Sequence, residues 1–200
     1  MFLREITVLS LFAGVSAGAP IVNMQLLNSP GQPAIYDFLV DRTTVVQTLC
    51  DDATHSIITD PYQATENTLA DLSGTLLSRN GNPEALADYE TIAMLDLRAL
   101  SDPALIRDVT IAEWAITQGR DARDPGAAAL LTWASTQDPA NYDLSNFVIF
   151  STPVYQEQTG FTGGGGGSGG GSVPEPRTSL LAGLAILLLT RRRLFARARG

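Results

Sequence analysis

The chain has 200 residues, of which 44% are hydrophobic, and this is enough for one folded domain with a sizeable core. All 13 basic residues are Arg, which excludes P-loop, Schiff-base and Lys-based isopeptide chemistry. One His and one Cys exclude an intramolecular disulfide and a zinc site built from His and Cys alone. The sequence therefore says more about where the protein goes than about its chemistry.

Residues 1–17 have the layout of a secretory signal peptide. A positive residue precedes an apolar stretch at residues 6–15, and small residues follow that stretch. We place the cleavage between Ala17 and Gly18, because a cut two residues later would put Pro20 directly downstream, where its ring hinders a peptidase. Signal peptidase and the secretion machinery are therefore expected partners, and the mature chain is expected to be exported.

Residues 18–158 are predicted to form one exported domain. Residues 18–172 contain 6 Arg and 19 acidic residues, a net charge near −13. An acidic surface repels nucleic acid, so no nucleic-acid partner is expected. No Asp-x-Asp-x-Asp-Gly loop supports a calcium site. We therefore expect a solvated acidic face, with no metal and no cofactor.

The first half of this domain is predicted to form β-strands. Segments rich in β-branched residues are separated there by Gly, Pro, Asn and Asp, which favour turns. These segments span residues 21–27, 35–40, 43–50 and 65–72.

The second half is predicted to form three helices and a closing strand. Asn82-Pro83, Asp102-Pro103 and Asp124-Pro125 each place a capping side chain before a Pro at the first helical position. Apolar residues then recur at helical spacing, and residues 146–151 follow as a short apolar strand. The predicted fold class is α+β, with N-terminal strands, a three-helix segment and a closing strand.

Residues 159–172 are predicted to be a Gly/Ser-rich linker. Residues 163–172 read GGGGGSGGGS, a composition that buries no side chain and loses the most backbone entropy on ordering. A flexible tether of this length has an r.m.s. span of roughly 18 Å.

An apolar run at residues 178–190 is followed by Arg191, Arg192 and Arg193. As a helix, the run rises only about 20 Å, which is short of the roughly 30 Å hydrocarbon core. Flanking Arg side chains can reach the headgroups while the bilayer thins, so a single transmembrane helix is predicted. The basic cluster acts as a cytoplasmic stop signal and leaves residues 196–200 as a basic cytoplasmic tail.

The C-terminal segment resembles the PEP-CTERM sorting signal of bacterial surface proteins. The resemblance covers residues 173–195, where the motif Val173, Pro174, Glu175 and Pro176, a short helix and an Arg cluster follow in that order. It implies recognition and cleavage by an exosortase, which is an integral-membrane thiol enzyme. It also implies a transient anchor in the inner membrane and release to the cell surface or into an exopolysaccharide matrix, as in a biofilm.

Residues 43–117 contain two segments that resemble the thioester domains of bacterial surface adhesins. Cys50 stands in a Leu-Cys-Asp-Asp segment, and Glu113 stands in an Ile-Ala-Glu-Trp-Ala-Ile segment. In that family a Cys is joined to a Gln of the second segment. Glu113 replaces that Gln here, and an ionised carboxylate is a poor electrophile that repels a thiolate. The resemblance implies a degenerate domain that does not form the bond spontaneously.

Three functions remain open from the sequence. The first is a non-catalytic structural or adhesive domain of a surface or matrix protein, in which Cys50 is a small buried hydrophobe. The second is a degenerate thioester-type adhesin domain that binds a surface or polymer through its Cys50 and Glu113 region. The third is a hydrolase or transferase that uses Cys50 and His55, with Asp60 nearby.

Overall fold

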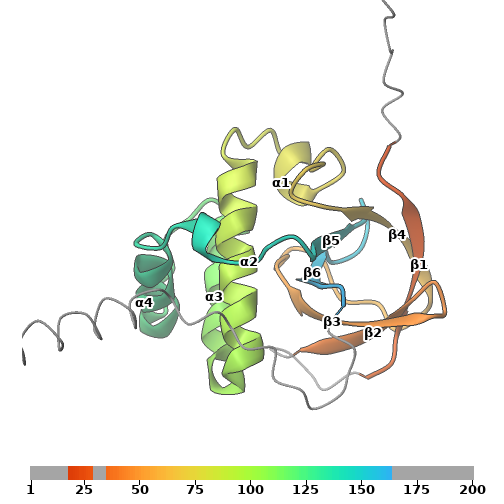
Figure 1. Cartoon of the computed structure of the whole chain (residues 1–200), viewed down its shortest axis with the longest axis horizontal. Helices are drawn as coiled ribbons and strands as arrows, with labels where there is room; N and C mark the ends of the chain where they lie inside the picture. Colours follow the sequence, from red (N-terminus) through yellow and green to blue (C-terminus); the bar gives the residue numbers. More distant parts are fainter. Residues whose placement is uncertain (1–17, 29–34, 164–200) are drawn as a thin grey trace, which may run out of the picture.

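The computed structural model describes residues 18–28 and 35–163, which form a six-stranded barrel with helices packed on one side (Figure 1). The strands close in the order β1-β2-β3-β6-β5-β4, and every neighbouring pair is antiparallel. The fold is therefore mixed α+β, as the sequence predicts. The strands are β1 (Ile21–Leu26), β2 (Tyr36–Val40), β3 (Thr44–Cys50), β4 (Tyr62–Asn67), β5 (Phe147–Ser151) and β6 (Gln158–Phe161).

The predicted signal peptide, the sorting motif and the C-terminal apolar run lie outside the described residues, as does the predicted linker beyond residue 163. None of the helices within the described part of the chain has the length and apolar content needed to cross a bilayer.

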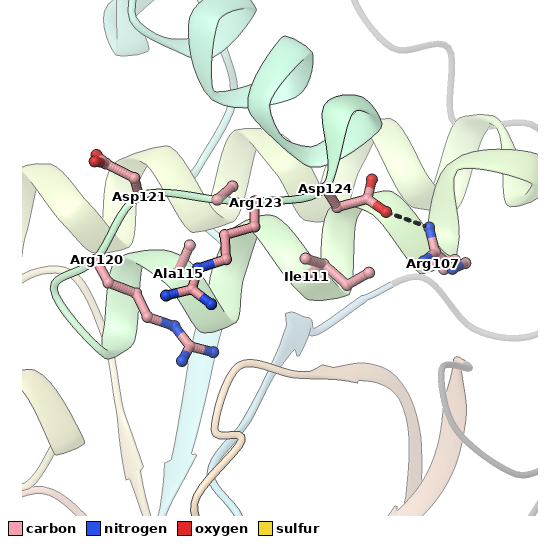
Figure 2. A pocket seen from close by; sticks show the side chains of 8 residues that line it. Arg107, Ile111, Ala115, Arg120, Asp121, Arg123 and Asp124 are labelled. Carbon is pink, nitrogen blue, oxygen red and sulfur yellow. Dashed lines mark hydrogen bonds and ion pairs between the residues drawn. The ribbon is translucent and has the colours of Figure 1, made fainter.

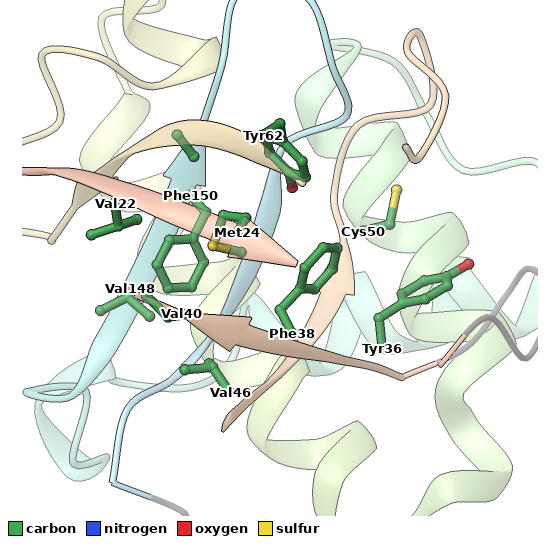
Figure 3. Close-up of a cluster of buried hydrophobic side chains, with 11 residues drawn as sticks. Val22, Met24, Tyr36, Phe38, Val40, Val46, Cys50, Tyr62, Val148 and Phe150 are labelled. Atoms are coloured by element: carbon green, nitrogen blue, oxygen red, sulfur yellow. The ribbon is translucent and has the colours of Figure 1, made fainter. Parts of the chain in front are cut away.

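The barrel interior is filled by alternate residues of the strands. Successive strand residues point to opposite faces, so β3 directs Val46 and Cys50 inward while Leu49 faces the helices. Two aromatic side chains, Phe38 and Tyr62, meet edge to face inside the barrel at 6.2 Å between ring centroids. The buried interior cluster, most of which Figure 3 labels, is Val22, Met24, Tyr36, Phe38, Val40, Val46, Cys50, Tyr62, Ala64, Val148 and Phe150.

The helices are inserted between β4 and β5. Helix α2 packs against β6, and α3 packs against β3, so the helices cover the part of the barrel where these two strands pair (Figure 1). Leu49 of β3 belongs to the cluster that the helices bury, together with Leu95 and Val109. The helical segments are α1 (Leu76–Arg79), α2 (Ala85–Ser101), α3 (Ile106–Thr117) and α4 (Pro125–Ala134), with 3₁₀ turns η1 (Pro103–Leu105) and η2 (Pro139–Asn141).

Two of the three predicted helix starts match the structure. The side chain of Asp124 accepts hydrogen bonds from two free backbone N–H groups at the start of α4. Asp102 caps η1, which leads directly into α3. The third start is shifted: Asn82 accepts a hydrogen bond from the N–H of Glu84, but α2 begins only at Ala85, with Glu84 as its N-cap and no capping side chain.

The fourth strand differs from the prediction. It spans Tyr62–Asn67 and not residues 65–72, because the chain turns after Asn67 through two backbone hydrogen bonds between Thr68 and Asp71. The two leucines of this turn segment are partly buried against the cluster that α2 forms with β5. Their burial explains the apolar pattern that suggested a longer strand.

Strand β6 is absent from the prediction. Its short Gln-Thr-Gly-Phe sequence carries little β-branched signal, and it crosses the boundary that the sequence placed after residue 158. The strand pairs with both β3 and β5 and so closes the barrel. Gly160 permits this pairing, since a Cβ atom there would lie 2.4 Å from the backbone oxygen of Gln47.

We predict that Gly160→Ala destabilises the domain by about 2 kcal/mol or more, because the new methyl group meets backbone that cannot rotate away. Urea unfolding of the purified protein measures the change. Gly18→Ala is the control, because a Cβ at Gly18 has no atom within 4 Å, and it should leave the midpoint unchanged. Equal midpoints for both variants would contradict closure of the barrel through β6.

Candidate functional site

Cys50 is the last residue of β3 and lies where the barrel meets the helices. Its side chain is 2% exposed and belongs to the barrel interior (Figure 3). The Sγ atom donates a hydrogen bond to the backbone oxygen of Asp52 at 3.3 Å. Burial and the neighbouring Asp51 raise the pKa of the thiol well above its ordinary range. Cys50 is therefore a protonated thiol at neutral pH.

Helix α3 is fastened to the end of β3 by two hydrogen bonds. The indole Nε1 of Trp114 donates to the backbone oxygen of Cys50 at 3.0 Å. One turn further, the hydroxyl of Thr117 donates to the backbone oxygen of Asp51 at 2.6 Å. Side chains of the helix thereby satisfy backbone carbonyl groups at the end of the strand. This pairing fixes the rotation of α3 against the barrel.

Glu113 precedes Trp114 and faces the same junction. Its side chain is fully buried, and Cys50 is close enough to contribute to the raised pKa of the Glu113 carboxyl. The two residues that the sequence singled out as a thioester-like pair therefore lie at one buried site, although they are separated by about sixty positions along the chain. A buried carboxyl beside a thiol is stable only when it holds a proton.

Four carboxyl groups meet at this junction, and each comes from a different segment. All four side chains are fully buried. Electrostatic coupling joins Asp51 with Glu157 and Asp96 with Glu113, so the group divides into two acid pairs. We name these four residues, Asp51 after β3, Asp96 on α2, Glu113 on α3 and Glu157 before β6, the carboxyl cluster.

Glu157 is the member of the carboxyl cluster with the most donors. Its carboxyl oxygens accept hydrogen bonds from the hydroxyls of Tyr89 and Ser151 and from the backbone N–H of Leu76. Three donors favour the ionised form, so Asp51 supplies the proton of its pair with Glu157. No hydrogen bond of ordinary geometry reaches the carboxyl oxygens of Asp51, Asp96 or Glu113 within the described residues. Burial without such donors favours the neutral acid at these three positions.

Burial is the main cause of the raised pKa values in the carboxyl cluster. It raises the pKa of Asp51, Glu113 and Glu157, and the neighbouring carboxyl charges raise those of Asp51 and Glu113 further. Burial raises the pKa of Asp96 to about 6, and the nearby side chains of Glu113 and Thr159 hold back a larger rise. No Arg forms an ion pair with any member of the cluster within the described residues.

His55 is paired with Asp52 in the loop after β3. The Nδ1 atom of His55 lies 2.6 Å from a carboxylate oxygen of Asp52. The other carboxylate oxygen accepts hydrogen bonds from the backbone and hydroxyl of Thr54. Burial alone would raise the pKa of Asp52, but these hydrogen bonds and His55 hold it below its ordinary value. The pair orders the loop that follows Cys50.

The geometry gives no support to the Cys/His alternative. Among the described residues, no hydrogen bond joins His55 to Cys50, and the Cys50 thiol is held in its protonated form. A nucleophilic Cys needs a lowered pKa and an adjacent base. Asp60 is exposed and is not the partner of His55. The sequence did not single out Asp52 as that partner, although its spacing three residues before His55 allows such a turn.

Metal chemistry also lacks a site in the described part of the chain. No three side chains among its His, Cys, Asp and Glu residues are arranged so that they could hold a metal ion.

Comparison with models of protein families, with curated proteins and with solved structures finds no match to this chain. The functional argument therefore depends on the residues themselves.

We predict that the carboxyl cluster makes the domain less stable as the pH rises. A carboxyl with a raised pKa binds more protons in the folded state than in the unfolded state. Its contribution to the free energy of unfolding is fully present below the pKa of the unfolded state, which is about 4. That contribution is lost as the pH rises through the pKa of the folded state, which is about 6 for Asp96. Urea unfolding between pH 4 and pH 8 should show a decline on the order of 2 to 3 kcal/mol from Asp96.

Asp96→Asn removes this titration and should flatten the decline. Asp60→Asn is the matched control, because it makes the same change at an exposed position and should follow the unaltered protein. If the difference between the Asp96→Asn and Asp60→Asn proteins did not vary with pH, the buried protons would have no part in stability.

Proposed function

We propose that this protein is an exported, exosortase-sorted component of the cell surface or of an exopolysaccharide matrix, with a non-catalytic structural or adhesive domain. The observation that supports this most strongly is the order of segments at the C-terminus. A folded domain ends at Phe161 and is followed by the Gly-rich run, the motif at residues 173–176, the apolar run and the Arg cluster. In this proposal a C-terminal helix anchors the chain transiently in the inner membrane.

The chemistry of the motif suits a protease substrate. Two prolines restrict the backbone of residues 173–176 to an extended form that makes few internal hydrogen bonds. Binding such a segment in a protease groove costs little conformational entropy. The Gly-rich run before it would keep the folded domain away from the membrane enzyme.

We predict that replacing Pro174, Glu175 and Pro176 together by Ala leaves the chain unprocessed and retained in the membrane. Intact mass and membrane fractionation in the native host measure the outcome. A variant with Asp60→Asn alone should still be cut at the C-terminus, because that change lies at an exposed position of the folded domain. Normal cleavage of the triple-Ala chain would rule out recognition of the motif.

A second proposal concerns the kind of domain that is exported. We infer a degenerate thioester-type domain that binds a surface or polymer non-covalently. The supporting observation is the junction at which Trp114 bonds to the backbone of Cys50 and Glu113 is buried beside the thiol. A thioester requires a thiol and an amide in such an arrangement, and Glu113 supplies a carboxyl in place of the amide.

The carboxyl at position 113 changes what this arrangement can do. In a thioester domain, the thiol attacks the amide carbon, the carbon–nitrogen bond breaks and ammonia leaves with the thiol proton. With Glu113, the leaving group would be hydroxide or water, and the reaction in water favours the free acid and thiol. The site then acts as a structural link between the barrel and the helix. In this proposal the outer surface of the domain carries out adhesion.

We predict that Glu113→Gln restores the bond. The variant should lose the mass of one ammonia molecule, and its Cys50 should no longer react with a thiol reagent after unfolding. Mass spectrometry of the denatured protein measures both. Added methylamine should open the bond and increase the mass by one methylamine.

The double variant Cys50→Ala with Glu113→Gln is the control and should lose no ammonia. If the single variant keeps its full mass and a free thiol, then the arrangement is not a thioester site, and only the first proposal stands.

A further inference from the structure

A pocket of about 480 Å³ opens on the helical side of the molecule, away from the barrel interior (Figure 2). Its floor is apolar and comes from α3, where Ile111 is half-buried and Ala115 is buried. Its rim comes from the loop between α3 and α4. This volume is within the range of pockets that bind small molecules. The loop residues on the rim are Arg120, Asp121, Ala122, Arg123 and Asp124.

The start of this rim loop is fixed by the end of α3. Gly119 has a φ of +59°, which is a left-handed conformation that favours glycine. The N–H of Gly119 donates to the backbone oxygen of Ile116 at 2.9 Å. The N–H of Arg120 donates to the backbone oxygen of Ala115 at 3.0 Å. These two bonds form a Schellman motif, which ends the helix and sets the direction of Arg120.

The far end of the loop is fixed by Asp124. One carboxylate oxygen caps α4, and the other lies 2.9 Å from an Nη atom of Arg107. Arg107 also pairs with Asp108 at 3.0 Å, so its charge is balanced by two carboxylates. The loop is therefore held at both ends, and one of the three arginines of the pocket is already occupied.

The other two arginines have no partner of opposite charge. Arg120 and Arg123 are exposed, and neither side chain forms an ion pair or hydrogen bond with any residue that the structure describes. Figure 2 shows both side chains running toward the same end of the pocket, near Ala115, whereas Asp121 points away from them. Two guanidinium groups that line one pocket attract an anion, and each presents paired donors that match a carboxylate.

The charge of the domain limits the size of that anion. Residues 18–163 contain 19 acidic residues and 6 Arg, so a long polyanion is repelled over most of the surface. A single acidic unit that enters the pocket avoids this repulsion. Three of the 6 Arg of the described residues line this pocket, so positive charge is concentrated there.

We propose that this pocket binds an acidic sugar of the uronate class, with its carboxylate between Arg120 and Arg123. The ring would lie on the apolar floor at Ile111 and Ala115, and ring hydroxyls would donate to the rim carboxylate of Asp124 at the other end of the pocket. An apolar acid has no donors for that carboxylate, and a bare inorganic anion would not use the floor. This proposal names a ligand class for the exported domain. It rests on the proposed function, because a cell-surface or matrix protein would encounter such a sugar. It does not depend on Cys50 or Glu113.

Saturation-transfer NMR on the intact protein with D-glucuronate tests this proposal. The ring protons of glucuronate should receive saturation, and those of glucose at the same concentration should receive at least tenfold less. The double variant Arg120→Gln with Arg123→Gln should abolish the glucuronate signal. Arg42→Gln removes one exposed Arg from the β2–β3 turn, outside the pocket, and should leave the signal unchanged.

Three results would overturn the proposal. They are equal signals from glucose and glucuronate, an undiminished signal in the double variant, and displacement of glucuronate by sulfate as readily as by glucuronate itself. The last result would mean an unselective anion site. This binding test uses no sorting step, so its failure would leave the triple-Ala processing test and the surface-protein proposal standing.

Discussion

The attachment of α3 to the end of β3 is the constraint on which the arrangement of the barrel and helices depends. Trp114 and Thr117 bond to the last carbonyl groups of the strand and thereby set the rotation of the helix. That rotation turns Glu113 toward Cys50 and toward the other acids of the carboxyl cluster. Since no basic residue in the described part of the chain balances these acids, the junction is stable only with protons bound. A domain with an acidic exterior thus also has an acidic interior.

Local signals in the sequence predict much of this fold. The Asp-Pro dipeptide at Asp124 and the capping residue Asp102 mark their helical segments correctly, because capping is decided by neighbours in the chain. Strand β6 could not be predicted, because four residues without a β-branched pattern become a strand only by pairing with β3 and β5. The predicted extent of β4 was wrong for a related reason. Leucines that are buried in a turn give the same apolar pattern as a strand.

The candidate site could be predicted only in part. The sequence singled out Cys50 and Glu113 through their short motifs, but Asp96 and Glu157 come from other segments and have no motif. Burial of so many acids is not a pattern that composition suggests, because acidic residues are usually exposed. The rim arginines were also missed, since their significance depends on the turn at Gly119, which directs them toward one pocket.

The central claim is that Glu113 is buried in its neutral form beside Cys50. Carbon-13 NMR titration of the side-chain carboxyl groups tests it directly, with the Glu113 signal assigned by its loss in Glu113→Gln. The account predicts that this carboxyl carbon titrates well above the ordinary Glu value, because burial and Asp96 raise its pKa. Titration near the ordinary Glu value of about 4.3 would contradict the account, since the carboxyl would then be ionised and could not occupy the buried junction.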